Sequence, residues 1–103
     1  MEENASENTM IKCQIEFSGG VELLFSNKKQ IEIEISKDKS TLRDMILLLG
    51  EQCQKKSLFI KDQSIRPGIL VLINEADWEL EGKEDYECQS GDIFTFISTL
   101  HGG

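Results

Sequence analysis

The 103-residue chain is poor in the residues that build metal sites, disulfide frameworks and membrane spans. It has one histidine and three cysteines, Cys13, Cys53 and Cys88, without a C-x-x-C pair. This pattern argues against a zinc site and favours reduced thiols. No apolar run approaches the roughly 18 residues that span a bilayer, and the polar opening MEENASEN lacks the features of a signal peptide. We therefore expect a small cytoplasmic protein of one domain, monomeric and without membrane contact.

Basic residues are scarce toward the C-terminus. From residue 75 onward there are eight acidic residues and one basic residue, a net charge of −7 out of −8 for the whole chain. Such a surface repels phosphate backbones, so we expect no direct binding of nucleic acid. Two interpretations of this acidic stretch remain open. It is either a solvated face that keeps the chain in solution or a surface that steers a basic protein partner.

Recognisable catalytic groups are also lacking. His101 has no Cys or Asp neighbour that would complete a triad, and the SGG at residues 18–20 lacks the Lys-Ser/Thr of a phosphate-binding loop. The carboxylates lie in polar surroundings that would not raise their pKa. We therefore expect a protein that is not an enzyme and that holds no metal or cofactor of its own.

Periodicity, by contrast, is clear. Alternating apolar residues in 10–17 and 28–36 predict two strands of a hairpin. The apolar runs 69–74 and 91–98 predict two more strands. The strand at 69–74 is expected to be covered on both sides or to cross the core, and the strand at 91–98 to be central in the sheet, beside the first strand. One helical face is formed by Leu42, Met45, Ile46, Leu49 and Cys53, with Ser40 or Thr41 as the helix cap. The predicted class is α+β, a mixed sheet of four to five strands with one main helix packed across it.

Several local expectations accompany this fold. Gly50 is predicted to lie on the helix face away from the core, and Lys55 and Lys56 to complement the helix dipole near its end. Pro67-Gly68 suits the centre of a type II turn, and the segment Trp78–Leu80 is expected to be extended. Cys13 and Cys53 are expected in the core, because cysteine is among the most buried residue types.

The chain ends in TLHGG, directly after the last predicted strand. A terminal carboxylate is ionised at neutral pH and is a poor electrophile, so it must be activated, for example as an acyl-adenylate, before a nucleophile attacks it. Two final glycines would let the tail enter a narrow channel of a partner enzyme and leave the carbonyl open. Leu100 would then offer an apolar grip and His101 a spacer. The opposing interpretation is an end without a role.

The motifs FSGGVELLF, SIRPGILVLIN, DWELEG and GDIFTFISTLHGG resemble the ubiquitin-related modifier family, from about residue 10 to the end. DWELEG and TLHGG are the most specific parts. The resemblance implies a ubiquitin-like β-grasp domain over residues 10–98, between a flexible acidic tail (1–9) and a flexible Gly-Gly tail (99–103). It also implies that Gly103 is the reacting residue and that Leu100, His101 and Gly102 are recognised by the activating enzyme.

The same resemblance implies specific partners. An E1-like activating enzyme with a rhodanese domain would use ATP to adenylate Gly103 and then convert it to a thiocarboxylate. That group would supply sulfur for 2-thiolation of the wobble uridine of certain cytosolic tRNAs, through a separate thiolase complex. The activated carbonyl would alternatively form an isopeptide bond with lysines of target proteins.

Two alternatives remain open at this point. The small sulfur-carrier subunit of molybdopterin synthase shares the fold and the Gly-Gly end. A non-catalytic ubiquitin-like binding module would have an inert tail and would bind partners through the exposed face of its sheet.

Overall fold

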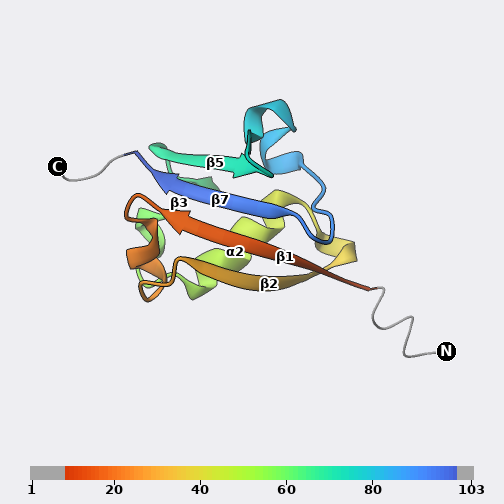
Figure 1. The fold of residues 1–103 in the computed structure, drawn as a ribbon, viewed down its shortest axis with the longest axis horizontal. Helices are drawn as coiled ribbons and strands as arrows, with labels where there is room; N and C mark the ends of the chain where they lie inside the picture. The colour runs from red at the N-terminus through yellow and green to blue at the C-terminus, as the bar shows by residue number, and fades with distance from the viewer. Residues whose placement is uncertain (1–8, 100–103) are drawn as a thin grey trace.

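The computed structural model describes residues 9–99. One sheet contains five strands in the order β2-β1-β7-β5-β6, which confirms the predicted mixed sheet (Figure 1). These strands are β1 (Met10–Ser18), β2 (Gln30–Ser36), β5 (Ile69–Ile73), β6 (Ala76–Asp77) and β7 (Ile93–Ser98). The last strand is central and lies beside β1, as predicted; the structure shows that these two strands are parallel and that the other pairs are antiparallel. Of the two predicted tails, only residue 9 and Thr99 are among the described residues.

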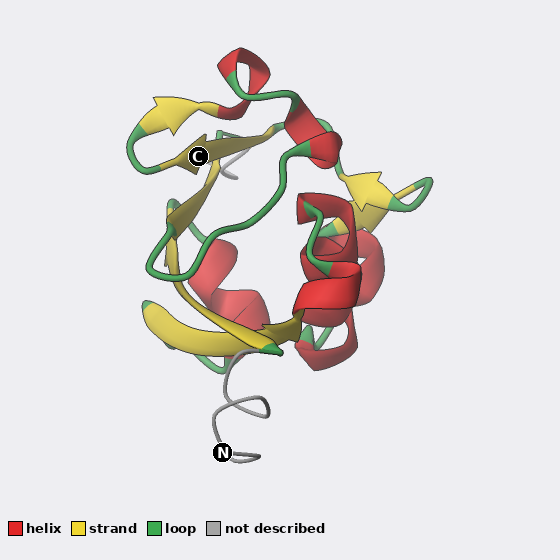
Figure 2. Cartoon of the chain, turned by 90° about the vertical axis from the view of Figure 1, so that its right-hand side faces the viewer, coloured by secondary structure: helices red, strands yellow, loops and turns green. Residues whose placement is uncertain are grey.

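One α-helix, α2 (Leu42–Gln52), packs on one side of this curved sheet (Figure 2). Thr41 rather than Ser40 is its N-cap. The Asp44 amide donates to Thr41 Oγ1 at 3.2 Å and the Thr41 amide donates to Asp44 Oδ2 at 3.3 Å, a reciprocal capping box. The buried face carries Leu42, Met45, Ile46 and Leu49, four of the five predicted residues, and Cys53 follows the helix as its half-buried C-cap.

The core lies between the sheet and α2 and is rich in phenylalanine. Phe25 stacks on Phe17 with ring centroids 4.2 Å apart, and Phe59 contacts Phe25 and Phe96 at 5.2 and 5.5 Å. Cys13 is 1% exposed, which confirms its predicted core position. Phe59 is fully buried although it lies outside every predicted element. Its burial is decided by the loop that brings it under the sheet, which local periodicity does not encode.

Short elements complete the fold. The VELLF segment forms a 3-10 helix, η1 (Val21–Phe25). A two-stranded ribbon of β3 (Ile60–Lys61) and β4 (Ser64–Ile65) was not predicted, since two residues are too few to show a period. The remaining 3-10 helices are η2 (Lys37–Lys39), η3 (Lys56–Leu58), η4 (Trp78–Leu80) and η5 (Lys83–Asp85).

Two expectations about α2 are wrong. Gly50 faces the interior, where a Cβ atom would lie 2.3 Å from Ile60 Cδ1, so a larger residue at this point would require the Ile60 side chain to shift. The helix ends at Gln52, before Lys55 and Lys56, and its last turn holds no basic residue. The chain leaves the helix here because the Gln54 amide donates to the Leu24 carbonyl at 2.9 Å, a tertiary bond that competes with further helix.

Two expectations about the third quarter of the chain are also wrong. Trp78–Leu80 is a 3-10 turn and not an extended piece, since the Asp77 carboxylate accepts the Glu79 amide at 2.9 Å and caps the turn. Strand β5 is covered on one side only. Val71 and Ile73 are buried, whereas Leu70 on the other face is 37% exposed.

Candidate functional site

The central strand β7 delivers the chain to an anchored exit point. The amide and Oγ1 of Thr99 both donate to the Gly68 carbonyl, at 2.8 and 2.7 Å. Gly68 has a φ of +100°, and the Ile69 amide donates to the Arg66 carbonyl at 3.2 Å, as a type II turn requires. The predicted Pro67-Gly68 turn therefore holds the last described residue of the chain, one residue beyond the predicted domain boundary at 98.

The SGG motif supports the same exit. Gly19 has a φ of +69°, and a Cβ atom there would lie 2.6 Å from the Ser98 carbonyl oxygen. Glycine is thus required for two reasons, its left-handed backbone and the close approach of the end of β7. The SGG motif, which lacks the signature of a phosphate-binding loop, therefore has a packing role beside the end of β7.

The four predicted tail residues, Leu100, His101, Gly102 and Gly103, lie outside the described residues. What the structure places is their starting point, Thr99. The structure does not test the predicted roles of these four residues.

An apolar groove borders the exit and was missed by the sequence analysis. Its volume is about 590 Å³. We call it the exit groove; its lining includes Leu23, Leu24, Leu58, Arg66, Pro67, Ile69 and Ser98. Leu23 is 64% and Leu58 is 46% exposed, so two leucines stand open to solvent beside the tail. The sequence signal that could have indicated the groove was the VELLF segment, because a single turn cannot bury all of its apolar side chains.

The titratable groups of the interior lie in surroundings that are typical of structural residues and not of catalytic residues. Burial, with the nearby Asp92 carboxylate, raises the pKa of Cys13 to about 11, and burial raises that of Cys88 to about 12. Both thiols are therefore protonated at neutral pH and are poor nucleophiles. Burial, followed by the bond to Asp92, also raises the pKa of the Tyr86 phenol.

Asp92 is buried but fully supplied with hydrogen-bond donors. Its carboxylate accepts the Tyr86 hydroxyl at 2.6 Å, and the Asn74 side-chain amide and the Gln89 backbone amide at 2.9 Å each. This network ties the turn after β5 to the start of β7. Within residues 9–99 no group of three His, Cys, Asp or Glu side chains is placed to hold a metal ion, and no helix is long and apolar enough to cross a membrane.

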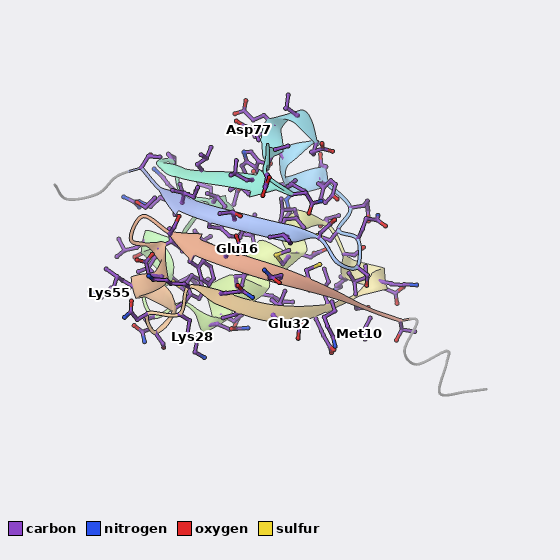
Figure 3. All side chains as sticks on the ribbon, in the orientation of Figure 1. Met10, Glu16, Lys28, Glu32, Lys55 and Asp77 are labelled. Atoms are coloured by element: carbon purple, nitrogen blue, oxygen red, sulfur yellow. The ribbon has the colours of Figure 1, made fainter. Side chains whose placement is uncertain are left out.

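The acidic stretch lies away from the exit. Ile69, at the start of β5, pairs with Ser98, whereas Ile73, at its other end, pairs with Ala76 and leads into the acidic segment. Four strand residues separate these positions by about 13 Å. In Figure 3, Asp77 lies above the arrowhead of β5, and Lys28 and Lys55 lie toward the opposite end of the molecule.

A mixed five-stranded sheet crossed by one helix, with the chain continuing past Thr99 from the central strand, defines a ubiquitin-like carrier of the β-grasp class. A family model described as Urm1 (Ubiquitin related modifier) matches residues 12–103. The "Ubiquitin-related modifier 1 homolog" of Dictyostelium discoideum is 52% identical over 96 residues, covering 90% of this chain and 100% of the relative. The chain therefore belongs to the ubiquitin-related modifier family.

Solved structures agree with this assignment. The solution structure of Urm1 from Trypanosoma brucei is similar with a TM-score of 0.77 and 35% identity, covering 91% of this chain and 97% of that one. The crystal structure of SAMP1 from Haloferax volcanii, 14% identical with a TM-score of 0.71 over 89% of this chain and 99% of that one, shares the fold alone. The predicted β-grasp fold is confirmed. Family membership makes this chain a small ubiquitin-like modifier and sulfur carrier and not a catalyst.

Proposed function

We propose that this chain carries sulfur on its C-terminus for 2-thiolation of the wobble uridine of cytosolic tRNA, and that the same terminus is conjugated to lysines of target proteins. Gly103 is the reacting residue in this proposal, and Leu100, His101 and Gly102 are the part of the tail gripped by the activating enzyme. The observation that carries the proposal is the family match, which runs through residue 103 and so includes the TLHGG end.

The proposed chemistry begins with the conversion of the Gly103 carboxylate into an electrophile. The Gly103 carboxylate attacks the α-phosphate of ATP, pyrophosphate leaves, and an acyl-adenylate forms on the E1-like enzyme. A thiol reductant releases hydrosulfide from a persulfide of the rhodanese domain and is itself oxidised to a disulfide; the hydrosulfide then attacks the carbonyl carbon and displaces AMP. The product is a thiocarboxylate. A lysine amine that attacks the same activated carbon forms an amide instead, which is the isopeptide bond.

The folded domain contributes position and not catalysis. Thr99 is tied to Gly68, and Gly19 lets β7 reach that anchor, so the tail starts from a fixed point. Binding energy between the domain and the enzyme is then available to place Gly103 at the adenylation site. A separate thiolase complex receives the sulfur, which agrees with a net charge of −8 that disfavours contact with tRNA.

The first test measures the mass of the terminus. The wild-type chain, incubated with the activating enzyme, ATP and a sulfur donor, is expected to gain the mass of one oxygen replaced by sulfur, located on the C-terminal peptide. Deletion of Gly102 and Gly103 should abolish the gain and leave the circular-dichroism spectrum unchanged. The matched control Lys39→Gln changes an exposed residue on η2, leaves the tail intact and should still be charged.

Either of two results would refute the proposal. One is a wild-type chain that gains no sulfur under these conditions, and the other is a truncated chain that gains it as well.

The binding-module alternative rests on the open face of β5, where Leu70 is exposed. It predicts that calorimetry finds partner affinity unchanged after the deletion. A molybdopterin synthase subunit would instead require a stable larger partner, and co-purification distinguishes that case.

A further inference from the structure

Two leucines that line the exit groove are exposed to solvent. Leu23 projects from η1 and Leu58 from η3, and they are 64% and 46% exposed. The groove between them continues over Pro67 and Ile69 to Ser98 at the end of β7. Apart from Leu80, Leu23 is the most exposed large apolar side chain of residues 9–99. Open leucines beside a concavity are typical of a binding surface.

A cation faces this apolar lining. Arg66 is half-buried, and its Nη1 donates to the Ser57 carbonyl at 3.1 Å, which holds the guanidinium at the groove. None of the ion pairs formed among the described residues involves Arg66. A guanidinium has more donors than this one bond uses, and its fork matches a carboxylate.

Two further cations lie near the groove in sequence. Lys55 and Lys56 are exposed and precede Leu58, with Ser57 between, but neither lines the groove. The Leu58 amide donates to the Lys55 carbonyl at 2.9 Å. Next to Leu23, the Glu22 carboxylate accepts the Gly20 amide at 3.0 Å. The groove thus combines apolar walls with one lining cation, Arg66, on a chain whose total charge is −8.

We propose that the exit groove is a docking site for a segment of a partner protein that combines apolar side chains with carboxylates. The apolar side chains lie between Leu23 and Leu58, and a carboxylate pairs with Arg66. The docked segment is a neighbour of Ser98, so a partner that binds here holds the point from which the tail leaves. This role does not depend on the chemistry of Gly103, and the two can fail separately.

A second copy of this chain is a poorer occupant. The Glu79-Leu80-Glu81 segment has the required chemistry, and Leu80 is 77% exposed. However, one leucine on a three-residue turn offers far less than the roughly 1,000 Å² that a stable interface buries. A phosphate-bearing ligand would satisfy Arg66 but not the leucines, so a peptide segment fits both halves of the groove.

The test uses a displayed library of random twelve-residue peptides selected on the full chain. We expect enriched peptides to combine Leu, Ile or Phe with Asp or Glu. The strongest peptide is then synthesised, and its affinity is measured by fluorescence anisotropy. The variant Leu23→Ser/Leu58→Ser should weaken binding by about tenfold or more, and Arg66→Gln by roughly fivefold, as expected for central contacts.

Matched controls lie outside the groove. Leu80→Ser removes a leucine that is more exposed than either groove leucine, and Lys39→Gln removes an exposed cation on η2. Both should leave the affinity within about twofold. Amide chemical shifts should move at Gly20, Leu23 and Leu58. The groove variants should keep the wild-type circular-dichroism spectrum, because both substituted leucines are on the surface.

Four results would overturn the inference. They are a library that yields no binder, enriched peptides that are basic, an affinity unchanged in the double leucine variant, and binding that Leu80→Ser weakens as strongly. A last measurement determines the peptide affinity of a chain truncated after Thr99. If removal of residues 100–103 raises the peptide affinity more than about tenfold, the occupant is the chain's own tail and not a partner.

Discussion

At the scale of single residues, the three cysteines differ in exposure and not in chemistry. Cys13 and Cys88 are 1% and 2% exposed, whereas Cys53 is half-buried at the C-cap of α2. Burial raises the pKa of all three thiols, more strongly for Cys13 and Cys88. A thiol must be both ionised and accessible to react. The fold therefore protects two thiols and leaves the third partly open.

Alkylation with iodoacetamide at pH 8 should follow this order. We expect Cys53 to react first and Cys13 and Cys88 about a hundredfold more slowly, since they need an opening that costs roughly 3 kcal/mol or more. Peptide mass spectrometry over time measures the rates, and Cys53→Ser is the control that removes the fast phase. Equal rates at all three sites would show that the interior opens readily.

The same thiols give the stability a defined dependence on pH. Their folded pKa values, about 11 for Cys13 and about 12 for Cys88, exceed the ordinary value of 9.0. The folded state therefore holds protons that the unfolded state loses, and stability falls as pH rises from about 9 to 12. Urea titrations across this range should show the loss, and Cys13→Ala should reduce its slope.

At the scale of elements, α2 illustrates how a tertiary contact overrides a helical pattern. Glycine lowers helix stability by about 1 kcal/mol relative to alanine. Gly50 is nevertheless buried against Ile60 of β3, whose terminal methyl occupies the space that a Cβ would need. The helix and the β3-β4 ribbon are thus fitted to one another at this position.

A double-mutant cycle tests this fit. Gly50→Ala alone should be close to neutral or destabilising, because the gain in helix propensity is offset by the contact with Ile60. In an Ile60→Val background, which removes that methyl, the same change should stabilise by about 0.5–1 kcal/mol. The expected coupling is therefore about 1 kcal/mol, measured by urea unfolding. Additive effects would mean that Ile60 simply rotates away.

At the scale of the whole molecule, charge is distributed unevenly. The segment from Glu75 to Glu87 is strongly acidic and follows the far end of β5, whereas the lining of the exit groove on the other side includes the cation Arg66. An acidic surface of this kind acts at long range, by speeding the approach of a basic partner, rather than by touching the tail.

Charge reversal at Glu79 and Glu81 should slow association with the activating enzyme several-fold at low salt and flatten the salt dependence of the association rate. Glu84 is left unchanged, because it accepts a hydrogen bond from Ser64, which lowers its pKa. Stopped-flow fluorescence gives the rates. The control Glu32→Lys/Asp38→Lys changes the net charge equally elsewhere. If both variants slow association equally, the association rate depends on net charge alone.

Much of the fold could be predicted because its signals are local. Alternation identified β1 and β2, the spacing of Leu42 to Leu49 identified α2, and its cap was predicted to be Ser40 or Thr41. The apolar run 91–98 predicted a central strand correctly. The errors at Gly50, at Lys55 and at Trp78–Leu80 share one cause. Each depends on a contact or cap, with Ile60, Leu24 or Asp77, that a repeating pattern does not contain.

By itself, the sequence determined the class of the fold, the family and the end of the chain, because periodicity, motif and terminal glycines are properties of consecutive residues. Only the tertiary structure decided where that end begins and what surrounds it. The bond from Thr99 to Gly68 joins positions 31 residues apart. The exit groove gathers Leu23, Leu58 and Arg66 from three separate segments. Long-range packing creates such surfaces, and their members carry no shared spacing in the sequence.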